Sequence, residues 1–74
     1  MIEVTKETSL GYLKLSRQLK ATYLERAKAE VAFHSFLGDD NKAIQWSVEV
    51  EVYTRNVALL DYAIGALEGI GMLP

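Results

Sequence analysis

Apolar residues in the second half of the chain recur at alternating intervals of three and four residues without a break. This interval defines a heptad repeat, whose a and d positions form one stripe along an α-helix. The a positions are Ala43, Val50, Val57 and Ile64, and the d positions are Trp46, Tyr53, Leu60 and Leu67. The pattern predicts a helix over residues 42–68, and these eight residues are its heptad seam.

The same segment carries a second apolar stripe on its other side. This stripe consists of Ile44, Val48, Val52, Leu59, Ala63, Ala66 and Ile70. A helix that is apolar on two sides has to be covered on two sides. One helix of the same chain can cover one of them, and a second copy of the chain is the simplest cover for the other. We assign the oligomer interface to the seam, at Trp46, Val50, Tyr53, Val57, Leu60, Ile64 and Leu67.

The first half of the chain predicts another long helix, over residues 8–37, that begins between Thr5 and Ser9. Helical spacing gathers its apolar residues on one broad stripe. The stripe consists of Tyr12, Leu13, Leu15, Leu19, Tyr23, Leu24, Ala27 and Val31. The opposite side is polar and basic, so this helix is amphipathic.

A single strong break, at residues 38–41, separates the two helices. Gly38 suits the left-handed position that ends a helix, and the Asp39-Asp40-Asn41 run that follows supplies good N-caps for the next one. A turn this short joins antiparallel neighbours. The sequence thus predicts an all-α fold: one domain over residues 1–74, an antiparallel two-helix hairpin with a short C-terminal tail, assembling into a helical-bundle homo-oligomer.

An α+β fold is the alternative, because residues 46–54 and 2–5 alternate between apolar and polar side chains as half-buried strands do. Two features argue against it. Nothing between Asn41 and Gly65 breaks the chain, and two short strands form only a marginal sheet.

Composition supports an oligomer. A chain of 74 residues buries only about 60% of its unfolded surface, yet half of these residues are hydrophobic. The absence of cysteine excludes disulfides and thiolate metal sites as the compensation. No stretch reaches the roughly 20 apolar residues of a membrane span, and the N-terminal segment lacks the apolar core of a signal peptide. We therefore expect a cytoplasmic protein without a membrane partner.

Charge is divided unevenly between the two halves. Residues 1–37 hold six basic and four acidic side chains, whereas residues 38–74 hold two and six. The basic and aromatic side chains of the first helix form a candidate site for an anion such as a nucleotide, although an ordinary solvated face has the same composition. The candidate residues are Tyr12, Lys14, Arg17, Lys20, Tyr23 and Lys28. The net charge of −2 argues against a nucleic acid as the partner.

Two further groups of polar residues are candidates for metal binding or for an ion pair. Glu30 and His34 lie four residues apart on one helix face and form a weak candidate metal pair, but two ligands are too few, so a structural hydrogen-bonded pair is the favoured interpretation. Asp61 lies at the rim of the seam, where two interpretations are equally open: a charge paired with a cation, either Arg55 or a basic residue from the first helix or another subunit, or an exposed rim position. We expect no cofactor and no resident metal.

No catalytic motif is present, and a single histidine without cysteine makes an enzyme a poor interpretation. The leading hypothesis is a non-enzymatic homo-oligomer that binds a macromolecular partner, of a size typical of small regulatory or phage accessory proteins. The alternative hypothesis is an oligomer that sequesters an anion or nucleotide on its first helix.

Overall fold

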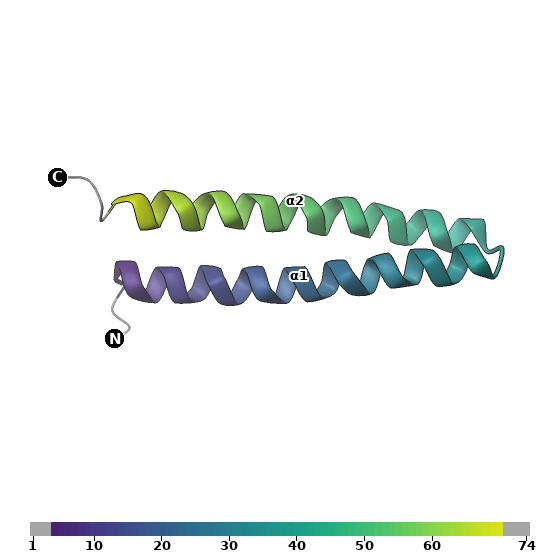
Figure 1. Cartoon of the computed structure of the whole chain (residues 1–74), viewed down its shortest axis with the longest axis horizontal. Helices are drawn as coiled ribbons and strands as arrows, with labels where there is room; N and C mark the ends of the chain where they lie inside the picture. Colours follow the sequence, from purple (N-terminus) through teal and green to yellow (C-terminus); the bar gives the residue numbers. More distant parts are fainter. Residues whose placement is uncertain (1–3, 71–74) are drawn as a thin grey trace.

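The computed structural model describes residues 4–70, which form two long α-helices joined by a tight turn (Figure 1). Helix α1 spans Lys6–Phe36 and helix α2 spans Asp40–Ile70. The helices run antiparallel, so that the start of α1 and the end of α2 lie at the same end of the hairpin. The predicted helical hairpin is confirmed, and each helix boundary lies within two residues of the predicted one. The predicted tail after residue 68 is helical to Ile70, and its residues 71–74 lie outside the described part.

The α+β alternative is wrong for the residues that the structure describes. Residues 46–54 lie inside α2. Of residues 2–5, Val4 and Thr5 precede α1 without forming a strand, and residues 2 and 3 lie outside the described part. The alternation misleads because Trp46, Val50 and Tyr53 also share one side at helical spacing, where α1 covers them.

The start of α1 is fixed by a reciprocal pair of threonines. The backbone N–H of Thr8 donates to Thr5 Oγ1 at 3.1 Å, and the backbone N–H of Thr5 donates to Thr8 Oγ1 at 2.9 Å. This capping box satisfies N–H groups that have no partner inside the first turn of a helix. Thr5 is therefore the N-cap of α1, and the helix begins at Lys6.

The turn is a Schellman motif followed directly by an N-cap. Gly38 has a φ of 76°, and the N–H groups of Asp39 and Gly38 donate to the carbonyls of His34 and Ser35 at 2.9 and 3.1 Å. The carboxylate of Asp39 then accepts from the backbone N–H of Lys42 at 3.2 Å. The last turn of α1 and the first of α2 are therefore both capped within three residues.

The seam of α2 lies against α1. All eight seam residues are partly buried, and α1 is the only other described element that can cover them. Among the described residues, Ala27 alone is fully buried. The hairpin is a flat body with Cα extents of 56 × 29 × 12 Å. Its radius of gyration is 16.7 Å, whereas a compact chain of this length has about 11 Å.

The hairpin exposes far more surface than a compact protein of its mass. Its accessible surface is 5824 Å², about 1,200 Å² more than the roughly 4,600 Å² typical of a folded 8.3 kDa monomer. This surface includes large apolar side chains, because the second stripe of α2 stays exposed at Ile44, Val48, Val52 and Leu59. Two helices lying side by side share one line of contact, which leaves both outer sides uncovered.

We expect Gly38→Ala to destabilise the protein by about 1 kcal/mol, because a Cβ at a positive φ crowds the neighbouring carbonyl oxygen. Gly11→Ala is the matched control. A Cβ added at Gly11, inside α1, would have no neighbouring side chain or distant backbone atom within 4 Å. Alanine should therefore stabilise the helix by about 0.5–1 kcal/mol. Urea unfolding at one protein concentration measures both changes, and effects of the same sign would contradict this account of the turn.

Candidate functional site

The hairpin has two broad faces, which helical geometry distinguishes. Leu24 and Ala27 form a row on α1 that faces α2. Because successive helical residues lie about 100° apart, Lys28 lies on one side of this row and Tyr23 on the other. The polar face carries Lys14, Arg17, Glu25, Lys28, Asp61 and Glu68. The aromatic face carries Tyr12, Leu19, Tyr23, Arg26, Trp46, Glu49, Val52, Tyr53 and Leu59.

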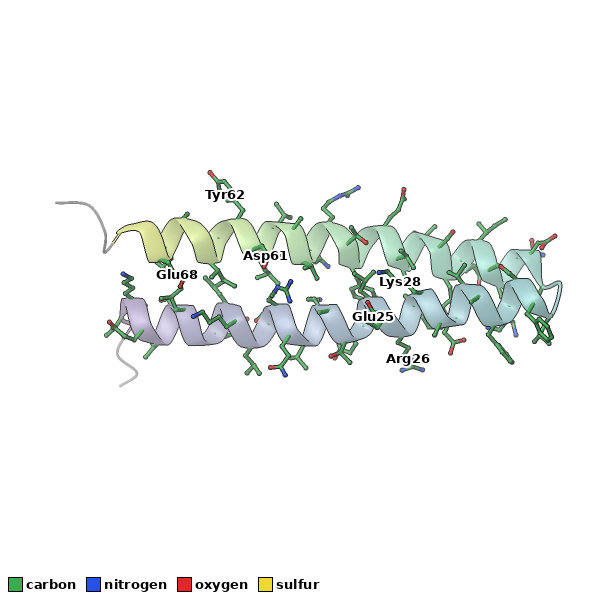
Figure 2. All side chains as sticks on the ribbon, in the orientation of Figure 1. Glu25, Arg26, Lys28, Asp61, Tyr62 and Glu68 are labelled. Atoms are coloured by element: carbon green, nitrogen blue, oxygen red, sulfur yellow. The ribbon has the colours of Figure 1, made fainter. Side chains whose placement is uncertain are left out.

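Ion pairs connect the two helices across the polar face. Arg17 Nε donates to Asp61 Oδ1 at 2.7 Å, and Arg17 Nη2 donates to Asp61 Oδ2 at 3.4 Å. Lys14 Nζ lies 3.8 Å from Glu68 Oε2, and in Figure 2 Asp61 points from α2 towards α1. The hydrogen bond to Asp61 and its negative charge raise the pKa of Arg17 above its ordinary value. Asp61 is therefore paired with a cation from α1, as the first of its two interpretations predicts.

The predicted anion site is divided between the two faces. Lys14, Arg17 and Lys28 lie on the polar face, each beside a carboxylate. Tyr12 and Tyr23 lie on the aromatic face, and Lys20 Nζ is 5.6 Å from the centre of the Tyr53 ring. The structure therefore does not bring these six side chains together around one ligand, and the anion hypothesis stays a prediction.

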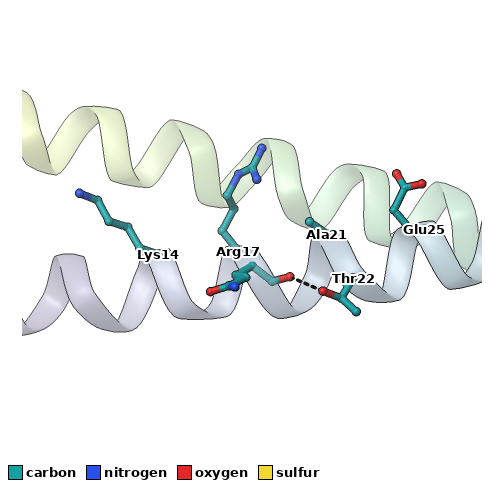
Figure 3. A pocket seen from close by; sticks show the side chains of 6 residues that line it. Lys14, Arg17, Ala21, Thr22 and Glu25 are labelled. Carbon is teal, nitrogen blue, oxygen red and sulfur yellow. Dashed lines mark hydrogen bonds between the residues drawn. The ribbon is translucent and has the colours of Figure 1, made fainter.

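A shallow depression borders two of these cations (Figure 3). It is lined by Lys14, Arg17, Gln18, Ala21, Thr22 and Glu25. The hydroxyl of Thr22 is already used, because it donates to the Gln18 carbonyl at 3.0 Å. With Glu25 at its edge and Arg17 bound to Asp61, the depression offers little free positive charge to an anion.

The aromatic centre, at the middle of the aromatic face, consists of Tyr23 from α1 and Trp46 and Tyr53 from α2. The rings of Tyr23 and Tyr53 lie 5.6 Å apart at 45°. Tyr53 and Trp46 border two adjacent depressions, which Tyr23 and Arg26 complete on one side and Gln45 and Glu49 on the other. Exposed apolar residues of both helices flank this centre, at Tyr12, Leu19, Val52 and Leu59. This face has the aromatic and aliphatic character of a protein interface.

The Glu30–His34 pair lies beside the aromatic face near the turn. His34 Nε2 is 3.2 Å from Glu30 Oε2, and the His34 side chain is only 13% exposed. Its Nδ1 atom is buried without a hydrogen-bond partner in the described part of the chain, and the ring meets Phe33 edge-on. Within residues 4–70 no third side chain of a metal-binding type joins this glutamate and histidine. The arrangement is a contact inside one helix.

The seven residues assigned to the oligomer interface all face α1 of their own chain. Trp46, Val50, Tyr53, Val57, Leu60, Ile64 and Leu67 are partly buried there. Their role between chains stays a prediction. Trp46 and Tyr53 reach the aromatic face, whereas the exposed second stripe is the surface that the chain itself leaves open.

Sequence reasoning did not single out Arg26 and Glu49 as site residues. Both border the aromatic centre, and Figure 2 shows Arg26 pointing from α1 away from α2. A helical wheel of α1 could have placed Arg26 beside Tyr23. Its position opposite Glu49 depends on how the two helices are aligned, which no single-helix pattern contains.

Comparison with protein-family models, with curated proteins and with solved structures finds no match to this chain. Over the residues described, neither helix has an apolar stretch long enough to cross a membrane.

If the ion pairs neutralise the polar face, Asp61→Asn should free Arg17 and strengthen binding of ATP at low ionic strength, with added salt weakening it again. Glu51→Gln is the control, because it removes the same charge from an exposed residue that has no ion pair within residues 4–70. Isothermal titration calorimetry compares the affinities. A wild-type protein that binds ATP as tightly as the Asp61 variant would show that the ion pair does not block the site.

Proposed function

We propose that the chain is a non-enzymatic interaction protein: a helical hairpin that assembles with copies of itself and binds a protein partner. The imbalance between interior and apolar surface carries this proposal. Ala27 is the only fully buried residue in the described part, whereas thirteen large hydrophobic side chains are exposed. A surface of this kind on a soluble chain is typical of an interaction site.

Association supplies the stability that one hairpin lacks. Complete burial of a large apolar side chain contributes roughly 1.5–3 kcal/mol, and a whole domain is stable by only about 5–15 kcal/mol. Covering a few residues such as Leu19, Val52 and Leu59 therefore changes stability by an amount comparable to the total. Folding and assembly of this chain are expected to be coupled.

The partner of the assembled protein is proposed to be another protein. Tyr62 is 79% exposed and Phe36 88% exposed, and Figure 2 shows Tyr62 on the outer side of α2, away from α1. Neither borders the depressions of the aromatic face, so both stay accessible when that face is covered. Aromatic side chains are enriched at protein interfaces. Nucleic acid is disfavoured, because residues 38–74 carry two basic and six acidic side chains.

Coupled assembly makes stability depend on protein concentration. We expect the melting temperature, followed by circular dichroism, to rise across a hundredfold increase in concentration. Sedimentation equilibrium should give a mass above that of one chain under the same conditions. A constant melting temperature together with the mass of a single chain would contradict self-association.

Two aliphatic residues of α2 with similar exposure separate the aromatic face from ordinary surface. Leu59 is 61% exposed on the aromatic face, whereas Ile44 is 62% exposed and lies five residues, and so about 140° around the helix, from Glu49. We expect Leu59→Gln to lower the free energy of unfolding of the assembly by about 2 kcal/mol, and Ile44→Gln to change it by less than about 0.5 kcal/mol. Urea unfolding at matched concentration measures both. Equal losses would mean that the aromatic face is not the covered one.

A further inference from the structure

Two charged residues on the aromatic face have no partner. Arg26 and Glu49 border depressions that share Trp46 and Tyr53. Neither forms an ion pair within the described residues, although three cations of the polar face do. The aromatic centre therefore has a positive charge on one side and a negative charge on the other. Opposite charges around an apolar centre are a means of fixing the orientation of a partner.

Arg26 and Glu49 lie at nearly the same distance from the turn. Arg26 is ten residues before the end of α1 at Phe36, and Glu49 is nine residues after the start of α2 at Asp40. At 1.5 Å per residue, both lie about 14–15 Å along the helices. A second copy with its turn at the same end therefore presents the opposite charge at the matching height.

We propose that the occupant of the aromatic face is the same face of a second copy, related by a twofold axis parallel to the helices. This deepens the self-association proposed above and rests on it. The axis sets α1 of each copy beside α2 of the other, with both turns at one end of a four-helix bundle. Because the contact is isologous, Arg26 of each copy meets Glu49 of the other, twice in one dimer.

The charges select this orientation over the other twofold arrangement. An axis perpendicular to the helices places the turns at opposite ends and sets α1 beside α1. Arg26 then lies near the height of the uncharged Ser16 of the other copy. Glu49 lies near the height of Asp61, which is on the polar face and bound to Arg17, so neither Arg26 nor Glu49 meets an opposite charge. Only the parallel axis pairs opposite charges.

The exposed surface of the whole hairpin is large enough to include a dimer interface. It exceeds that of a compact monomer of this mass by about 1,200 Å², and a standard interface buries about 800 Å² on each partner. The aromatic face also supplies Trp46, Tyr53 and Arg26, which belong to the residue types that dominate binding energy. The polar face cannot serve in the same way, because its ion pairs are already formed within one chain.

Charge reversal tests the contact between chains. Arg26→Glu and Glu49→Arg are prepared as separate variants, and each homodimer then contains two like-charge contacts. We expect each variant alone to have a dissociation constant at least about tenfold above wild type. In an equal mixture both contacts of the heterodimer become Glu–Arg pairs. The heterodimer should therefore regain wild-type affinity and make up more than the half of all dimers that random pairing gives. Native mass spectrometry distinguishes the three dimers by mass.

The mixture separates contacts between chains from contacts within a chain. Within either variant chain, residues 26 and 49 carry like charges, so mixing restores affinity only through the other copy. Arg55→Glu and Glu51→Arg, on exposed positions of α2 outside the aromatic face, are the matched control pair and should dimerise as wild type and mix statistically. If the single variants unfold alone, recovery of helical circular dichroism on mixing supports the proposal, and a mixture that stays unfolded overturns it.

The remaining outcomes distinguish this inference from the proposed function. Variants that dimerise like wild type, or that mix only statistically, overturn the parallel-axis orientation and leave self-association intact. A wild-type chain that stays monomeric at high concentration overturns both.

Discussion

The contact between α1 and α2 is the constraint on which the rest of this protein depends. Two helices lying side by side bury one strip of side chains, and here that strip is narrow enough that Ala27 alone becomes fully buried among the described residues. Every other apolar residue within residues 4–69 is partly or fully accessible to water. Such a hairpin is marginal by itself, because the conformational entropy lost on ordering two long helices needs a larger buried apolar area to offset it. The proposed assembly supplies that area.

The polar interactions determine how the helices align and which side stays open. The Schellman turn at Gly38 and the cap at Asp39 set where one helix ends and the next begins. The Arg17–Asp61 and Lys14–Glu68 pairs then connect the helices along one face. Exposed ion pairs contribute little to stability, but they satisfy the charges of that face within one chain. Unpaired charges and apolar side chains are left on the opposite face, which is therefore the side that a partner can cover.

Much of the architecture could be predicted from the sequence. The heptad seam, the Gly38 break and the Asp39 cap are local patterns, and local patterns determine where helices form and end. The assignment of charged residues to a site was less successful. Lys14, Arg17, Tyr12 and Tyr23 lie close together in the sequence, but they fall on two faces because a helix rotates them apart. The favoured interpretation of Glu30 and His34 agrees with their contact, since residues four apart on a helix are neighbours whatever surrounds them.

The sequence by itself determined two helices, their boundaries and an excess of apolar surface, because each of these follows from residues near one another along the chain. Only the tertiary structure decided which cation meets Asp61, that the seam lies against α1, and that Arg26 and Glu49 flank one aromatic centre at the same height. These relations depend on the rotation and relative shift of two helices. Both are set by contacts between residues more than twenty positions apart, which no periodic pattern within either helix records.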